Sequence, residues 1–322
     1  MRTTLICLVI TMSIVQYAVA QSGAVPDSEV QEMQEVLGTG EQPGPAPWKV
    51  TYGENTLWIL GELTPMPAKV TWRSREVEAV MAKSHELLID GGGVMTAGGG
   101  LAALRYTNRV KKSQKLPKGQ ILKDVVPADL YARFSSLRQA YAKGDDTLEH
   151  MRPLYAGTAL RDQALKRLGL TRAGISQSVV KLAEKADVKV PRVRSDLGDP
   201  LPILDNVERS STASCLQESV VILESSRDEM QRLANAWSAG DLDVLRGLVP
   251  SRKNDECLPV LLGGEDRAKA IFSEHLQAWL AAAEQALRTN VTTFALVQID
   301  DLFSPDGRLA ALRDRGYRVE EP

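Results

Sequence analysis

The sequence predicts an α/β fold, with a central β-sheet built from strands near the two ends of the chain and a large helical insertion between them. Near the N-terminus, residues 48–52 and 57–64 are rich in Val, Leu, Trp and Ile and flank a Gly53-Glu54-Asn55 turn, which is typical of a β-hairpin. Near the C-terminus, an apolar run at 294–299 precedes a turn, a helix at 308–315 and a last short strand, a unit that suits an α/β layer. Between these ends, apolar residues recur at helical spacing over about 121–290.

The first twenty residues have the features of a secretory signal peptide. Arg2 supplies a positive start, residues 5–15 are apolar, and Ala18-Val19-Ala20 matches an A-x-A cleavage site. An uncleaved anchor is the alternative, although the apolar run is short for a helix that needs about 20 apolar residues to span a bilayer. We expect cleavage after Ala20, a periplasmic or secreted protein, and no membrane span in the mature chain.

The remainder divides into an arm and one domain. Residues 21–47 are polar and rich in Gly and Pro, which predicts a flexible arm, and residues 48–322 form the α/β domain. A short helix is expected over 73–84, followed by a strand that ends at Asp90. The triplets Gly91–Gly93 and Gly98–Gly100 match no phosphate-binding signature and are interpreted as loop glycines.

Four longer helices are expected in the insertion. Pro127 suits a first helical turn, Gly169 suits a C-cap, and Gly240 suits the end of a long helix that begins near Cys215. The fourth helix is expected over 265–289.

The overall charge gives no reason to expect a nucleic acid as partner. The chain has 39 Lys and Arg against 41 Asp and Glu, a net charge of −2. A local basic run lacks interleaved aromatic residues and is interpreted as a solvated loop; its members are Arg109, Lys111, Lys112, Lys115 and Lys118.

Cys215 and Cys257 are the two cysteines that remain after the predicted signal peptide. In an oxidising compartment, an even count of two predicts one disulfide. The alternative is a pair of buried free thiols.

Three segments resemble the TraB/GumN family, and together they span nearly the whole mature length. They are Trp48-Lys49-Val50 with Leu57-Trp58-Ile59-Leu60-Gly61, residues 82–90, and the closing stretch 294–320 with Asp306-Gly307 and Arg315-Gly316-Tyr317. The segment Ala234-Asn235-Ala236-Trp237 is similar to the GumN-like branch of that family.

The resemblance implies a metal-dependent hydrolase or protease, in which two G-x-x-H histidines and a glutamate lie near the metal. In this chain, Thr64 and Asp301 stand in place of the two histidines, and Asp90 stands in place of the glutamate. Gln298 replaces the glycine that opens the second motif, and His275-Leu276 replaces an Arg-Asn pair in the last long helix. A threonine hydroxyl is a poor zinc ligand, so these replacements predict the loss of the family's metal site.

Two interpretations of the remaining polar residues stay open. In the first, the residues left at the two motifs form a degenerate pocket without catalytic residues or a metal, comprising Gly61, Glu62, Thr64, Asp90, Asp300 and Asp301. In the second, Glu62, Asp90, Asp300 and Asp301 cluster near Thr64 and bind a hard cation such as Mg²⁺, Ca²⁺ or Mn²⁺. The three histidines, His85, His150 and His275, form no local ligand pair and are expected to be structural or exposed.

The sequence therefore favours an exported, disulfide-bonded, non-catalytic binding or scaffolding protein of the cell envelope, which uses no cofactor. Its partner would be a peptide, a glycan or another envelope protein. The alternative is a metal-dependent hydrolase that uses the rebuilt carboxylate site.

Overall fold

The computed structural model describes residues 43–67, 72–95, 101–143, 145–199, 201–209, 211–248 and 257–322. The predicted signal peptide, residues 21–42 of the predicted arm, and Gly98–Gly100 lie outside these residues.

Six strands form the central sheet, in the order β6-β4-β7-β2-β1-β8. A separate two-stranded sheet pairs β3 with β5. The strands are β1 (Trp48–Tyr52), β2 (Asn55–Glu62), β3 (Met66–Pro67), β4 (Leu87–Met95), β5 (Leu170–Thr171), β6 (Arg192–Gly198), β7 (Thr292–Gln298) and β8 (Arg318–Glu320).

Four neighbouring strands of the central sheet run in the same direction. β6 is parallel to β4, β4 to β7, and β7 to β2, whereas β1 is antiparallel to both β2 and β8. The carboxyl ends of β2, β7, β4 and β6 therefore lie at one edge of the sheet, which is where open α/β sheets place ligand sites.

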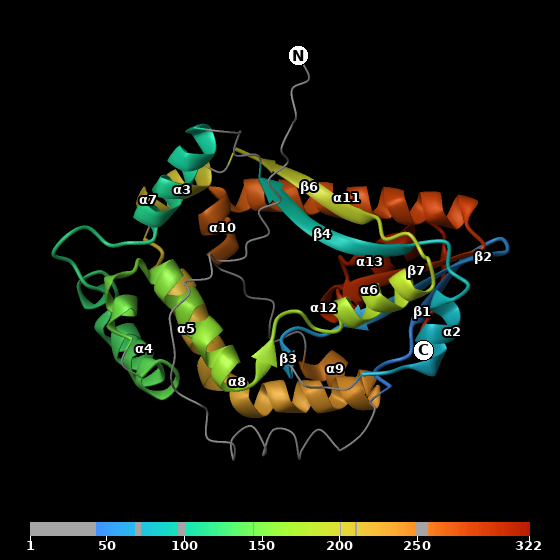
Figure 1. The fold of residues 1–322 in the computed structure, drawn as a ribbon, viewed down its shortest axis with the longest axis horizontal. Coiled ribbons are helices and arrows are strands. Elements are labelled where there is room, and N and C mark those ends of the chain that lie inside the picture. The colour runs from blue at the N-terminus through green and yellow to red at the C-terminus, as the bar shows by residue number, and fades with distance from the viewer. Residues whose placement is uncertain are drawn as a thin grey trace.

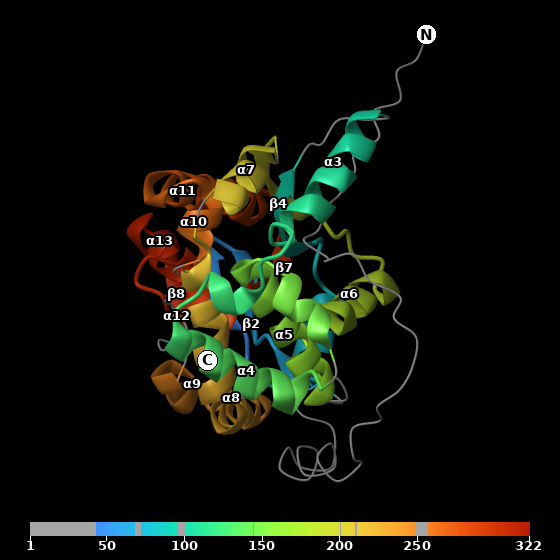
Figure 2. The same ribbon diagram turned by 90° about the vertical axis from the view of Figure 1, so that its left-hand side faces the viewer.

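Helices cover both faces of the sheet and form a second body beside it (Figures 1 and 2). The helices are α2 (Arg75–Met81), α3 (Leu101–Ser113), α4 (Ala128–Tyr141), α5 (Pro153–Arg167), α6 (Ser176–Lys185), α7 (Leu201–Arg209), α8 (Ala213–Ala239), α9 (Leu242–Leu248), α10 (Cys257–Leu262), α11 (Glu265–Thr289), α12 (Ile299–Phe303) and α13 (Arg308–Asp314), with short 3-10 helices at Leu122–Asp124 and Asp146–His150.

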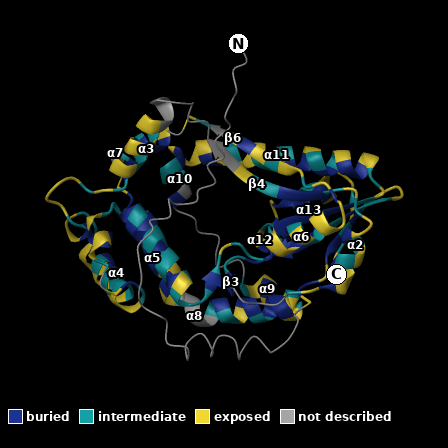
Figure 3. Ribbon diagram, in the orientation of Figure 1, coloured by how far each residue is buried: buried dark blue, intermediate teal, exposed yellow. Residues whose placement is uncertain are grey.

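Helix α11 crosses one face of the sheet and contacts β1, β2, β4, β6 and β7. Its buried residues include Trp279, Leu280 and Ala283, while its exposed residues face outward in Figure 3. Helix α2 contacts β7 and also α6, which lies in front of the sheet in Figure 1. These contacts confirm the α/β class and the joining of strands from the two ends of the chain.

Helix α8 connects the two largest hydrophobic clusters among the described residues. Leu216, Val220 and Leu223 in its first half pack with residues of α4 and α5. Leu233 and Trp237 in its second half pack into the core around the sheet. One long helix thus fixes the helical body relative to the sheet.

Two segments that the sequence predicts to be loops contain regular structure. Gly91–Gly93 continue β4 beyond Asp90 to Met95, where β4 pairs with β6. A Cβ at Gly91 would lie 2.8 Å from the Val193 carbonyl oxygen, so the glycine permits close pairing with β6. The basic run does not form a loop throughout, because Arg109, Lys111 and Lys112 belong to α3. Arg109 binds Asp205 and Glu208, with its Nη2 2.6 Å and 3.1 Å from their carboxylates.

The expected helical insertion also contains a strand of the central sheet. β6 pairs with β4 although it lies within 121–290, so the insertion is not wholly helical. Its sequence, Arg192–Gly198, alternates exposed Arg192 and Arg194 with half-buried Val193 and buried Ser195. That alternation is short and contains charged residues, which is why the apolar content did not reveal it.

Residues 43–47, the described end of the predicted arm, pack against the domain. The Gly44 amide donates to the Ser238 carbonyl at 3.3 Å, and the Trp72 indole donates to the Pro43 carbonyl at 3.0 Å. Gly44 and Pro45 are buried. The prediction of a flexible arm therefore remains for residues 21–42 alone.

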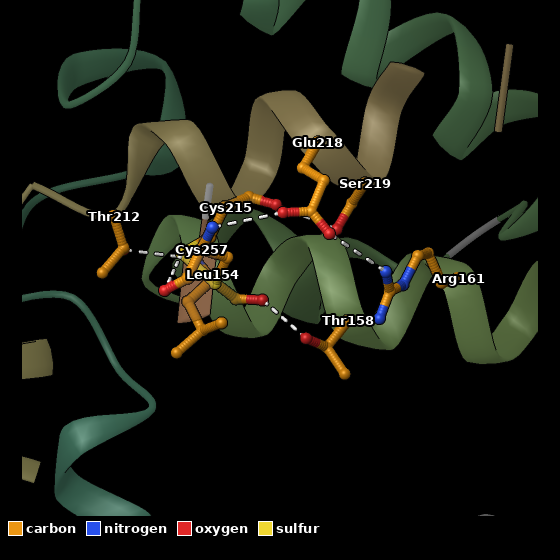
Figure 4. Close-up of a disulfide and its surroundings, with 8 residues drawn as sticks. All are labelled: Leu154, Thr158, Arg161, Thr212, Cys215, Glu218, Ser219 and Cys257. Atoms are coloured by element: carbon orange, nitrogen blue, oxygen red, sulfur yellow. Dashed lines mark hydrogen bonds and ion pairs between the residues drawn. A yellow bond between two sulfur atoms is a disulfide. The ribbon is translucent and has the colours of Figure 1, made fainter. Parts of the chain in front are cut away.

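A disulfide joins Cys215 at the start of α8 to Cys257 at the start of α10 (Figure 4). Both cysteines are buried and pack with Leu154 and Val207. Glu218 accepts a hydrogen bond from the Cys257 amide at 3.2 Å. The predicted pairing is present, and it fixes α10 against α8.

None of the helices in the described part of the chain is both long and apolar enough to cross a membrane.

Candidate functional site

Polar side chains from several elements meet where β2 and β7 reach their carboxyl ends, beside the middle of β4 and β6. Glu62 and Gln298 end β2 and β7 and are paired in register. Asp90 lies on β4, and Ser195 lies on the neighbouring β6. Helices α11, α12 and α13 add further side chains, and the contacts divide the residues into two groups.

The first group, here called the Asp90 cluster, comprises Asp90, Ser195, His275, Asp301 and Arg308. The guanidinium of Arg308 donates from Nη2 to Asp90 at 2.7 Å and from Nη1 to the carboxylate of Asp301. The backbone amide of Arg308 also donates to Asp301, at 2.8 Å. Because Arg308 is only 5% exposed, a nearly buried cation bridges two carboxylates that come from β4 and α12.

His275 extends this cluster from α11 to β6. Its Nε2 lies 2.9 Å from both carboxylate oxygens of Asp90, and its Nδ1 lies 2.6 Å from the hydroxyl of Ser195. A serine, a histidine and an aspartate are thus linked in a chain, which is the set of groups used in nucleophilic catalysis. Ser195 is only 6% exposed, however, and Asp90 is already bound by Arg308. These hydrogen bonds orient His275 between β4 and β6.

The two carboxylates of the cluster respond differently to their surroundings. Burial alone would raise the pKa of Asp90, but hydrogen bonds from His275 and the Gly92 amide and the charge of Arg308 hold it below its ordinary value. Burial raises the pKa of Asp301 above its ordinary value, although Arg308 opposes that change. Asp90 therefore carries the more firmly held negative charge.

The second group, here called the Glu62 cluster, comprises Glu62, Thr64, Ser176 and Gln298. Glu62 accepts hydrogen bonds from the Ser176 amide at 2.8 Å and from the Gln298 side-chain amide at 3.2 Å. The Thr64 hydroxyl donates to the oxygen of that same Gln298 amide at 3.0 Å. The Ser176 amide belongs to the first turn of α6 and also donates, at the longer distance of 3.3 Å, to the Ala173 carbonyl that precedes the helix. Glu62 thus joins β2, β7 and α6.

Burial raises the pKa of Glu62 to about 7, although the backbone hydrogen bonds from Ser176 and Ile175 partly offset the effect. Glu62 is 7% exposed, so its ionised form loses most of its hydration. A carboxyl group with this pKa exchanges its proton near neutral pH, and such a group is suited to acid–base chemistry.

Replacing Glu62 by glutamine is expected to change how the stability depends on pH. Because the folded-state pKa is raised, the folded protein binds the proton more tightly than the unfolded chain does. The stabilising effect of the proton is complete below the unfolded pKa and is lost as the pH rises through about 7. The loss is about 3 kcal/mol between pH 4.5 and 8 for a shift of this size.

Urea unfolding at a series of pH values measures this effect. The wild type should lose stability over that range relative to Glu62→Gln, and the difference should level off above neutral pH. Asp300→Asn is the matched control, because Asp300 is an exposed carboxylate at the same edge. Parallel pH curves for the wild type and Glu62→Gln would contradict the assignment.

The structure places the predicted pocket residues in two groups rather than one. Glu62 and Thr64 share Gln298, whereas Asp90 and Asp301 share Arg308. The Gly61 carbonyl accepts a hydrogen bond from the Trp237 indole, and the exposed Asp300 accepts one from the Asp301 amide. Glu62 and Asp90 lie on strands that flank β7, so their backbones are roughly 10 Å apart.

Sequence reasoning missed the basic members of the site. His275 was expected to be structural or exposed, and Arg308 was assigned no role, yet both bind Asp90. One signal was available for His275, since it stands where the family resemblance places an Arg-Asn pair. Nothing local in Asp306-Gly307-Arg308 indicates that the guanidinium turns back to a strand more than two hundred residues earlier in the sequence.

The residues present do not fit a divalent cation as they stand. The guanidinium of Arg308 lies between the two carboxylates that would have to bind the ion, and its positive charge opposes the entry of another cation. Within the described residues, no three His, Cys, Asp or Glu side chains are arranged to hold a metal ion.

The fold and this site define the chain as an α/β protein with a largely buried polar site at the carboxyl ends of β2 and β7. The chain belongs to the TraB/PrgY/gumN family, whose model matches residues 46–321. That match covers the strands near both ends of the chain and the whole insertion between them. No curated protein and no solved structure matches the chain.

Proposed function

We propose that this chain is an exported, non-catalytic member of the TraB/PrgY/gumN family that binds or scaffolds a partner in the cell envelope. The observation that carries the proposal is the set of contacts made by the residues at the positions that the family resemblance assigns to metal ligands. Asp90 and Asp301 bind Arg308, and the Thr64 hydroxyl binds Gln298. Residues that would hold a metal in a hydrolase are engaged with protein groups here, which supports a structural use of this edge and no cofactor.

Export is supported by two independent features. The sequence of residues 1–20 has the pattern of a cleaved signal peptide, with cleavage after Ala20. The Cys215–Cys257 disulfide suits an oxidising compartment such as the periplasm or the extracellular space. The partner would be a peptide, a glycan or another envelope protein, and the near-neutral charge gives no support for a nucleic acid.

Rescue of a deletion strain separates binding from catalysis. Glu62→Gln and Asp301→Asn keep the shape of each side chain while removing its acid–base chemistry. Both variants are expected to restore the wild-type envelope phenotype when they are folded and exported, and to give the same photo-crosslinked products as the wild type. A folded variant that retains those products but fails to rescue would contradict the proposal.

A second candidate is a hydrolase that uses the carboxylates Glu62, Asp90, Asp300 and Asp301, with a hard cation such as Mg²⁺, Ca²⁺ or Mn²⁺. The raised pKa of Glu62 favours this candidate, because the group can accept or donate a proton near pH 7. Arg308 weighs against the cation. Hydrolysis of ester or peptide substrates that requires a divalent metal and is lost in Glu62→Gln would establish this candidate.

A further inference from the structure

Arg308 has the surroundings of a bound ion rather than of a surface arginine. Its side chain is 6% exposed and bridges carboxylates from two separate elements. Its guanidinium carbon lies 5.2 Å from the centre of the Trp279 ring, within the range of a cation–π contact. Trp279 itself is fully buried, so the cation is enclosed on the side of α11.

The backbone around Arg308 is built to hold it there. Gly307 precedes it, and a Cβ at Gly307 would lie 1.9 Å from the Asp301 carbonyl oxygen. Only glycine allows α13 to begin this close to α12. The close approach brings both the amide and the guanidinium of Arg308 onto the Asp301 carboxylate.

The cluster also needs a positive charge. Burial disfavours the ionised forms of Asp90 and Asp301, and the charge of Arg308 lowers the pKa of both carboxyl groups. We infer that Arg308 is a tethered cation, which takes the place of a metal ion between Asp90 and Asp301 and makes this site independent of metal. The inference concerns the cluster itself and stands whether or not the chain proves to bind an envelope partner.

The tethered cation accounts for the disagreement between the site and its family. A divalent ion needs ligands that no other group of the protein already binds. A guanidinium, in contrast, forms its hydrogen bonds to the carboxylates when the chain folds. In this chain Asp90 keeps a carboxylate at the glutamate position, Asp301 puts a carboxylate in place of a histidine, and Arg308 supplies the positive charge between them. The chain therefore places a positive charge between these two carboxylates without an exchangeable ion.

Chemical rescue of Arg308→Ala tests this inference. The variant leaves a cavity beside two carboxylates and is expected to lower the melting temperature of the protein by about 10 °C. Methylguanidinium at non-denaturing millimolar concentration should raise the melting temperature of the variant in a saturable manner, and should leave the wild type unchanged. A panel of Mg²⁺, Ca²⁺ and Mn²⁺ should likewise stabilise the variant only.

Arg315→Ala is the matched control. Arg315 follows α13 and pairs with Glu284 of α11 at 3.0 Å, but its side chain is 32% exposed. Its loss should have a small effect that neither methylguanidinium nor a divalent metal reverses. The inference is overturned if Arg308→Ala responds to none of these cations, or if the wild type is stabilised by a divalent metal and loses that response in Asp90→Asn.

A double variant covers the case in which Arg308→Ala does not fold. Arg308→Met removes the cation and keeps most of the side-chain volume, and Asp301→Asn removes one of the carboxylates that require it. The double variant Arg308→Met/Asp301→Asn should have a higher melting temperature than Arg308→Met alone. A double variant that is no more stable than Arg308→Met would show that the two charges are not coupled.

Discussion

Replacing Trp237 by alanine is expected to destabilise the protein by about 4 kcal/mol and to disturb the Glu62 cluster. Trp237 is fully buried near the end of α8, and its indole donates to the Gly61 carbonyl at 2.8 Å. Its ring packs against Trp72, with centroids 6.4 Å apart. The substitution therefore opens a large cavity and leaves the Gly61 carbonyl without its donor, beside the strand end that carries Glu62.

Urea unfolding measures the loss, and two variants divide it into its parts. Trp237→Phe keeps most of the ring but removes the indole N–H, so it should cost about 1–3 kcal/mol. Trp58→Ala removes a tryptophan of β2 that is only half-buried, and its effect should be smaller than that of Trp237→Ala. Equal losses for Trp58→Ala and Trp237→Ala would contradict the role assigned to Trp237.

The predicted effect of Trp237 on the Glu62 cluster can be measured separately from its effect on stability. If Trp237 holds the end of β2 in place, its loss should admit water to Glu62 and lower the pKa of that carboxyl toward its ordinary value. The pH dependence of stability that Glu62 produces should then become weaker in a Trp237→Phe protein that remains folded. An unchanged pH profile would show that the Gly61 hydrogen bond does not support the Glu62 cluster.

The strands at the two ends of the chain could be predicted because their apolar residues lie in continuous runs. β2 and β7 are buried on both faces over most of their length, so the runs at 57–63 and 294–299 are visible in the sequence alone. The parallel pairing of these two strands placed both motif remnants at one edge, as the family resemblance implied. The sequence did not predict that β4 continues beyond Asp90 or that β6 joins the sheet. Glycines in β4 and arginines in β6 interrupt the apolar pattern that is typical of a strand.

The sequence predicted the acidic residues of the candidate site but not the residues that bind them, and the reason is physical. Acidic residues were found because they stand at motif positions, which are fixed by sequence spacing. Their partners were not found, because Arg308, His275 and Ser176 reach them through tertiary contacts that no local pattern encodes. The burial of these side chains could not be predicted from the sequence either, and it is burial that raises the pKa of Glu62 to about 7.

Removing the disulfide is expected to destabilise the protein by about as much as the loss of Trp237, but by another route. Cys215 and Cys257 are 42 residues apart in the sequence, and a closed loop of this size corresponds to about 4 kcal/mol on the chain-entropy model. The double variant Cys215→Ser/Cys257→Ser should therefore unfold at a lower urea concentration than the wild type. Its pH profile should be unchanged, since the disulfide packs in a separate cluster with Leu154 and Val207, away from Glu62.

Reductant provides the decisive control for this prediction. Dithiothreitol should lower the stability of the wild type toward that of the double variant, and should leave the double variant unchanged. The unfolded mature protein should show no titratable thiol before reduction and two after it. Two titratable thiols without reductant would contradict both the disulfide and part of the support for export, because buried free thiols are equally compatible with a reducing compartment.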